Sequence, residues 1–100
     1  MLKHIVMWKL KDQAEGRDRA ANALEMKRRL DECARVVPGI LTFEVTIAQT
    51  GLEATCDVVL YSEFADRAAL AAYAAHPTHQ ALVPFIGAIR EGRQCIDYEV

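Results

Sequence analysis

The strand expected over Lys3 to Lys11 restricts the fold most, because the middle of this strand is apolar on both faces. Alternate positions place His4, Val6, Trp8 and Leu10 on one face and Ile5, Met7, Lys9 and Lys11 on the other. A strand that is buried on both sides needs a layer of structure on each side. The 100 residues contain helices enough for one layer only. Something other than the helices of this chain must therefore cover the second face.

The first half of the chain continues with a helix and a pair of strands. Apolar residues recur at helical spacing over Gly16 to Val37, and Pro38-Gly39 ends this predicted helix and turns the chain. The residues from 41 to 48 alternate in hydropathy like a strand with one dry face. A hairpin turn at Thr50 to Glu53 leads to a third strand, over 56–64.

The second half repeats the pattern with a broken helical region. Asp66 is a good N-cap for a second helix, which Pro77 stops. Thr78 is expected to cap a further helical segment, which ends at Gly92, and Gln94 to Val100 forms the last strand. The order is β-α-β-β-α-β. We therefore predict an α+β, ferredoxin-like fold with a four-stranded antiparallel sheet and its helices on one face.

Composition excludes several classes of function. Hydrophobic residues make up 52% of the chain, which favours one compact domain over residues 1–100. Twelve basic and fourteen acidic residues without a block of one sign predict neither nucleic-acid nor membrane binding. The first residues enter a strand at once, so we expect a cytoplasmic protein. The three cysteines, Cys33, Cys56 and Cys95, are widely spaced and predict neither a disulfide framework nor a zinc site.

Four motifs resemble those of a known family. They are Lys3-His4-Ile5-Val6, Ser62-Glu63-Phe64, Tyr73 with His76-Pro77-Thr78-His79, and Asp97-Tyr98-Glu99-Val100. With them the chain resembles, over nearly its whole length, the Dabb family of stress-responsive dimeric α/β-barrel domains. In that family two sheets pack face to face. The resemblance implies a homodimer in which Ile5, Met7, Val59 and Tyr61 form the interface.

The expected fold also gathers polar side chains that can transfer protons. His4 points from the first strand toward the helices, while Tyr73, His76 and His79 lie near the end of the second helix. We expect a small apolar pocket beside them, lined by Val6, Trp8, Leu30, Val58 and Phe85. A histidine that titrates near neutrality can act as a base, and a tyrosine hydroxyl can hold or protonate a carbonyl oxygen.

The family includes polyketide cyclases that use a tyrosine and a histidine in an aldol cyclisation. The resemblance implies that Tyr73 and His79 correspond to this pair and His4 to a histidine on the first strand. Two further positions that are polar in those cyclases correspond to Val58 and Leu30 in this chain. The expected pocket is therefore drier and less polar than that of the cyclases. We therefore predict a protein that binds a small, mostly apolar molecule. The alternative is a cofactor-independent cyclase, lyase or isomerase that acts on a carbonyl compound.

Each of these residues also has a structural interpretation. His76 can end a helix, where an imidazolium meets the negative end of the dipole. His79 can donate to a loop carbonyl, Tyr73 can be a core aromatic, and His4 can be a satisfied histidine of the sheet. A metal site is disfavoured, because the helix break between His76 and His79 removes the i, i+4 geometry of helical metal pairs. We expect neither a metal nor a cofactor.

Overall fold

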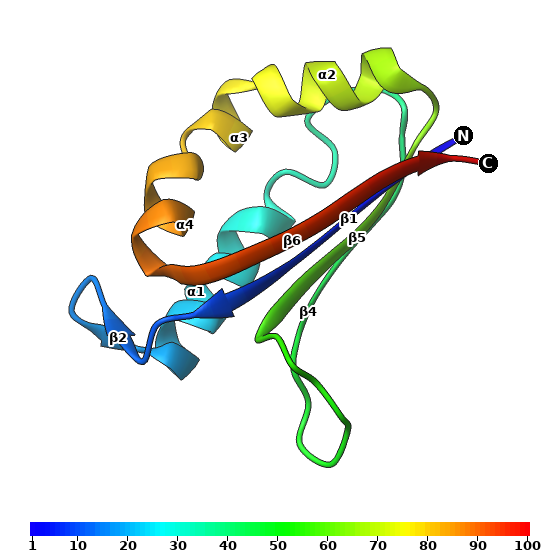
Figure 1. The fold of residues 1–100 in the computed structure, drawn as a ribbon. Helices are drawn as coiled ribbons and strands as arrows, with labels where there is room; N and C mark the ends of the chain where they lie inside the picture. The colour runs from blue at the N-terminus through cyan, green and yellow to red at the C-terminus, as the bar shows by residue number, and fades with distance from the viewer.

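An antiparallel sheet of four strands is the frame of the structure, a computed structural model that describes Met1 to Val100 (Figure 1). Its strands are β1 (Leu2–Leu10), β4 (Ile40–Ile47), β5 (Val58–Phe64) and β6 (Arg90–Glu99). Their order across the sheet is β4-β5-β1-β6, and every neighbouring pair is antiparallel. The predicted ferredoxin-like α+β fold is thereby confirmed.

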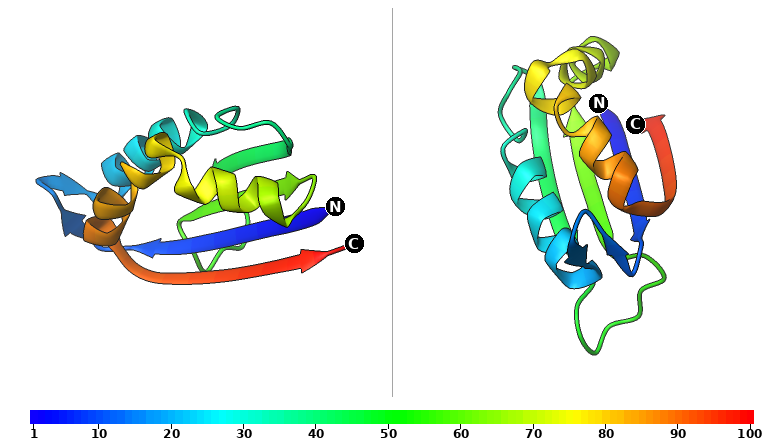
Figure 2. Two further views of the ribbon diagram at one scale, coloured as in Figure 1. Left: turned by 90° about the horizontal axis from the view of Figure 1, so that it is seen from above. Right: turned by 90° about the vertical axis from the view of Figure 1, so that its left-hand side faces the viewer.

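All the helices lie over one face of this sheet (Figures 1 and 2). They are α1 (Arg19–Asp31), α2 (Arg67–Ala75), α3 (Pro77–Gln80) and α4 (Val83–Ile89). Strand alternation places the buried side chains Val58, Leu60 and Phe64 of β5 against them. The other face of the sheet is left without a covering layer. Each helix falls short of the length and apolar content that crossing a membrane requires.

The first helix is shorter than expected at both ends. Two short strands, β2 (Gln13–Ala14) and β3 (Arg17–Asp18), form a separate hairpin ahead of it. Glu15 and Gly16, with φ of 53° and 73°, form the turn of this hairpin, so Gly16 cannot open the helix. The Asp18 carboxylate accepts a hydrogen bond from the Ala21 amide at 2.8 Å and caps α1. Beyond Asp31 the chain continues in turns, although Cys33 remains buried.

The second helical region begins as predicted and then differs in one cap. The Asp66 carboxylate accepts a hydrogen bond from the Ala69 amide at 2.8 Å, which caps α2. The cap of α3 is His76 and not Thr78, because Nδ1 of His76 accepts a hydrogen bond from the Thr78 amide at 3.1 Å. Since Nδ1 is the acceptor, it carries no proton there. His76 therefore caps α3 through a ring nitrogen, Nδ1, that carries no proton.

The last strand begins earlier than the sequence indicated. Helix α4 ends at Ile89, and β6 starts at the next residue, Arg90, instead of at Gln94. Gly92, which was expected to end the helix, is paired with Lys9 inside the sheet. The early start brings the side chains of Arg90 and Arg93 close to the helices.

Candidate functional site

A cavity of about 390 Å³ lies between the sheet and the helices, a size typical of small-molecule sites. Six of the predicted site residues line it: His4, Val6, Trp8, Leu30, Tyr73 and His79. The strand β1, the first helix and the α2–α3 region each contribute to this wall. The structure therefore brings the two histidines and the tyrosine into one cavity, beside apolar side chains.

His79 is oriented by a backbone carbonyl. Its Nδ1 lies 3.0 Å from the carbonyl oxygen of Ala74. A carbonyl can only accept, so Nδ1 donates and the lone pair is on Nε2. Burial lowers the pKa of His79 below its ordinary value of 6.5, with smaller contributions from the charges of His4 and Arg93, while the Ala74 hydrogen bond opposes the shift. At neutral pH this imidazole is therefore uncharged and can accept a proton at Nε2.

Tyr73 lies next to His79 and is held by aromatic neighbours. The two ring centroids are 4.7 Å apart, and the ring of His4 lies 6.4 Å from that of Tyr73. Phe64 and Phe43 pack against Tyr73 from the sheet, and only 2% of the tyrosine is exposed. Burial, with a smaller effect of Cys33, raises the pKa of Tyr73 strongly. The hydroxyl therefore stays protonated and can donate a hydrogen bond to a carbonyl oxygen.

His4 has a carboxylate partner that the sequence analysis did not identify. Asp97 pairs with His4 in the register of β1 and β6, and its Oδ1 lies 2.5 Å from Nδ1 of His4. The carboxylate accepts, so Nδ1 of His4 donates and Nε2 is left unbonded. Asp97 also lines a smaller adjoining cavity with His4, Tyr73 and His79. In the sequence, Asp97 stood out only as a member of the last motif. Its contact with His4 depends on the register of β6 with β1, which the sequence does not reveal.

Three residues predicted for the pocket lie outside it. Val58 pairs with Trp8 and is buried in the core, and Leu60, two residues further on the same face, lines the cavity in its place. Phe85 faces α1, where the centroid of its ring lies 4.1 Å from the guanidinium carbon of Arg29. His76 is used as the cap of α3.

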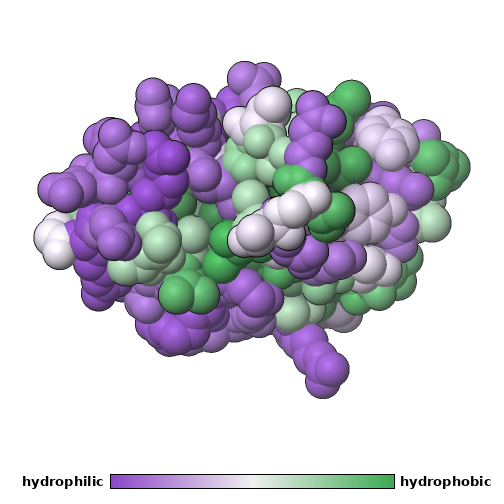
Figure 3. All heavy atoms as spheres, turned by 90° about the horizontal axis from the view of Figure 1, so that it is seen from below, coloured by the Kyte–Doolittle hydropathy of each residue, from purple (hydrophilic) through white to green (hydrophobic).

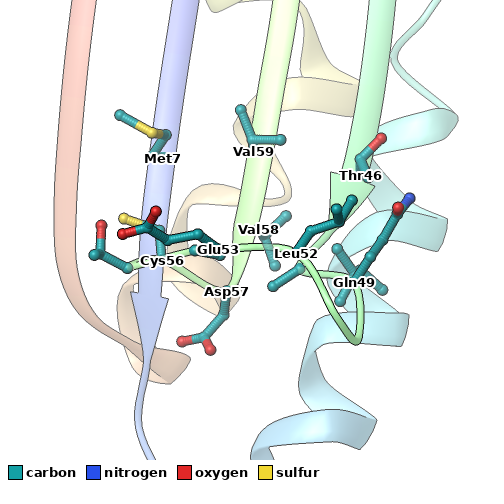
Figure 4. Close-up of a pocket in the computed structure, with 13 residues that line it drawn as sticks. Met7, Thr46, Gln49, Leu52, Glu53, Cys56, Asp57, Val58 and Val59 are labelled. Carbon is teal, nitrogen blue, oxygen red and sulfur yellow. The ribbon is translucent and has the colours of Figure 1, made fainter.

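A second cavity, of about 620 Å³, opens on the face of the sheet that carries no helix (Figure 4). The long loop between β4 and β5 forms one side of it, with Leu52 and Cys56 labelled in the figure. Met7 and Val59 of the sheet form its floor, and both belong to the predicted dimer interface. This hollow is therefore part of the open sheet face and is separate from the histidine cavity.

The fold and the cavity define a ferredoxin-like α+β protein with a cavity, lined by two histidines and a tyrosine, between sheet and helices. Its family is shown by the family model "Stress responsive A/B Barrel Domain", Dabb, which matches residues 2–100. The chain belongs to the Dabb family. No curated protein matches it.

Solved structures with the same fold cover nearly the whole chain. A dimeric protein of unknown function from Bacteroides fragilis is 31% identical, with 99% of this chain and 95% of that chain covered and a TM-score of 0.74. A Dabb family protein from Mesorhizobium loti is 25% identical, with 99% and 95% covered and a TM-score of 0.74. A protein described as an antibiotic biosynthesis monooxygenase is 25% identical, with 100% and 98% covered and a TM-score of 0.75.

Proposed function

We propose that this Dabb protein is a homodimer whose subunits each bind a small, mostly apolar molecule between sheet and helices. The cavity beside His4, Tyr73 and His79 is the observation that carries this proposal. Val6, Leu30 and Leu60 supply its apolar wall, and the three polar side chains converge on one part of it. A few convergent polar groups on an apolar wall are typical of ligand sites.

The open face of the sheet supports the dimer. Ile5 pairs with Tyr61 and Met7 with Val59 on this face, so the expected interface residues form two adjacent rows. Met7 is 40% exposed, and Ile96 of the neighbouring β6 is 58% exposed. Figure 3 shows apolar side chains gathered among hydrophilic ones on the underside of the molecule. The relative from Bacteroides fragilis is described as dimeric. A second copy would remove this apolar surface from water.

We propose that the protein is located in the cytoplasm. Cys33, Cys56 and Cys95 are all free thiols. Thiols remain free most readily in a reducing compartment.

Binding is tested by closing the cavity from helix α4. Gly87 lines the cavity, and a Cβ built on it would meet no atom within 4 Å. A Gly87→Leu substitution should therefore fill the cavity without disturbing the fold. Ligands drawn from medium-chain ketones and lactones should raise the melting temperature of the wild type and leave that of Gly87→Leu unchanged. An equal shift for both proteins would exclude this cavity as the site.

A second candidate function is acid–base catalysis on a carbonyl compound, and the orientation of His79 favours it. Nε2 of His79 is unbonded while Nδ1 is held by Ala74. In this mechanism Nε2 removes a proton from the carbon next to a carbonyl group, and the Tyr73 hydroxyl donates a hydrogen bond to the carbonyl oxygen. The resulting enolate carbon can attack a second carbonyl carbon, as in an aldol cyclisation, and the proton held at Nε2 of His79 then passes to the alkoxide oxygen that forms.

Substitution of the acid–base pair separates the two functions. If the protein is a cyclase, lyase or isomerase, His79→Ala and Tyr73→Phe should each lower turnover by about two to four orders of magnitude. Both proteins should remain folded by circular dichroism. If the protein only binds, the same substitutions should change affinity mildly, and no turnover of linear polyketide analogues should be detected in the wild type.

A further inference from the structure

The cavity wall contains two arginines that sequence reasoning placed outside the site. Arg90 and Arg93 come from the start of β6 and line the same cavity as His79. Neither forms an ion pair with a carboxylate, and the only side-chain partner of Arg93 is the Cys95 sulfur, at 3.3 Å. Four other arginines are paired with carboxylates: Arg19, Arg28, Arg29 and Arg67. The two guanidinium groups at the cavity thus keep their donors available.

A third candidate donor comes from the neighbouring strand β1. Trp8 pairs directly with Arg93 in the register of β1 and β6, so both side chains stand on the helix-covered face. Trp8 is only 4% exposed, and its indole Nε1 is buried without a hydrogen-bond partner. Leaving a buried N–H unpaired costs about 1–3 kcal/mol. An acceptor atom of a bound molecule would remove this cost.

We infer that the cavity carries an anion subsite, formed by Arg90, Arg93 and the indole N–H of Trp8, that binds the carboxylate of the ligand. The inference rests on the proposed binding function and narrows it to one class, the medium-chain carboxylic acids, including oxo acids. A carboxylate offers two oxygens to the fork of a guanidinium, and a third donor can bind a remaining lone pair. The alkyl chain then lies along Val6, Leu30 and Leu60, toward Tyr73 and His79.

The surrounding charges are compatible with an anion at this place. Asp97 and Glu99 are acidic groups on the same face of β6, where Oδ1 of Asp97 is engaged by His4 and Glu99 forms an ion pair with Arg67. Asp97 lines the adjoining cavity, which Arg93 also lines, and not the wall that holds Trp8 and Arg90. The charge of Arg93 is also one of the influences that lower the pKa of His79. Arg93 therefore acts electrostatically on the histidine end of the cavity as well.

The test compares ligands that differ only in their head group. Octanoate, octan-1-ol and octyl phosphate are titrated calorimetrically into the wild type and the variants Arg90→Gln, Arg93→Gln and Trp8→Phe. We expect octanoate to bind more tightly than octan-1-ol. Each arginine substitution should lower the affinity for octanoate by about tenfold or more, because a hydrogen bond to a charged group is lost. Binding of octan-1-ol should be unchanged. Trp8→Phe should lower the affinity for octanoate while preserving the apolar wall.

The control is Arg35→Gln, which changes the net charge equally at an exposed arginine that does not line the cavity. It should bind octanoate like the wild type. Equal binding of octanoate and octan-1-ol, with no effect of Arg90→Gln or Arg93→Gln, would overturn the anion subsite and leave the binding function intact. Binding of neither molecule would overturn both. Tighter binding of octyl phosphate than of octanoate would overturn the assignment to carboxylates.

Discussion

The imidazole of His79 is fixed in one tautomer by the Ala74 carbonyl, and burial disfavours its charged form. These two effects leave an unprotonated Nε2 at neutral pH, with a backbone carbonyl and not a carboxylate as the hydrogen-bond partner of His79. His4 is arranged differently, because Asp97 accepts from its Nδ1. The cavity thus holds two imidazoles with different partners. The Nδ1 of His79 donates to a backbone carbonyl, whereas the Nδ1 of His4 donates to a carboxylate.

Stability should depend on pH through His79. Its pKa is lower in the folded protein than its ordinary value of 6.5. As the pH falls, the unfolded chain therefore binds a proton first, so the stabilisation is fully present above pH 6.5 and is lost as the pH falls toward the folded pKa. The free energy of unfolding, measured by urea denaturation between about pH 5 and 7, should fall less steeply for His79→Asn than for the wild type. Identical slopes would contradict this prediction.

At the level of elements, the position of α2 depends on the start of β4. The Ala65 amide, just before α2, donates to the Gly39 carbonyl at 2.8 Å. Gly39 has a φ of 91°, and a Cβ built on it would lie 2.8 Å from the Cβ of Ala69 in α2. The helix that carries Tyr73 can approach the sheet this closely only because residue 39 has no side chain.

Gly39→Ala should therefore destabilise the protein in two ways, by strain at a positive φ and by the collision with Ala69. We expect a loss of about 2–4 kcal/mol in the free energy of unfolding. Gly51→Ala is the matched control, because Gly51 also has a positive φ, of 87°, but a Cβ added there would meet no atom within 4 Å. This control should lose only about 1–2 kcal/mol. Equal losses in the free energy of unfolding for Gly39→Ala and Gly51→Ala, measured by urea denaturation, would show that the contact with α2 does not contribute to stability.

The elements were more predictable than the site. Alternation along β1 and β5 correctly indicated which side chains face the helices, because a strand has a fixed period of two. The rotation of α4 was not predictable from spacing alone, so Phe85 was assigned to the cavity although it packs against Arg29. Arg93 and Asp97 were missed for a related reason. Their positions depend on where β6 begins and on its register with β1, which only tertiary pairing determines.

For the whole molecule, the uncovered sheet face is the largest feature that the chain itself does not explain. One end of this face is more polar than the sequence pattern indicated. The Tyr61 hydroxyl donates to Glu63 at 2.6 Å, and Thr42 donates to the other oxygen of this carboxylate at 2.8 Å. These hydrogen bonds lower the pKa of Glu63. An interface over this face would thus combine an apolar centre, around Met7 and Val59, with a hydrogen-bonded margin.

A charge in that centre should prevent the proposed dimer. Val59→Asp would bury a carboxylate without a partner between two sheets, so we expect monomers or aggregates in light scattering. Leu24→Asp is the control, because Leu24 is 65% exposed on α1, away from the sheet. It should remain dimeric. A dimer of unchanged mass for Val59→Asp would contradict the proposed interface.

The order of the strands has a consequence for how the protein is made. Strand β6 is synthesised last, yet its only neighbour in the sheet is β1, which is synthesised first. On the ribosome, one edge of β1 therefore stays unpaired until β6 has emerged, and such an edge can pair with other chains. The last strand also brings Arg93 and Asp97. A nascent or prematurely terminated chain consequently lacks both the closed sheet and these two residues, so the cavity is completed only when translation reaches β6.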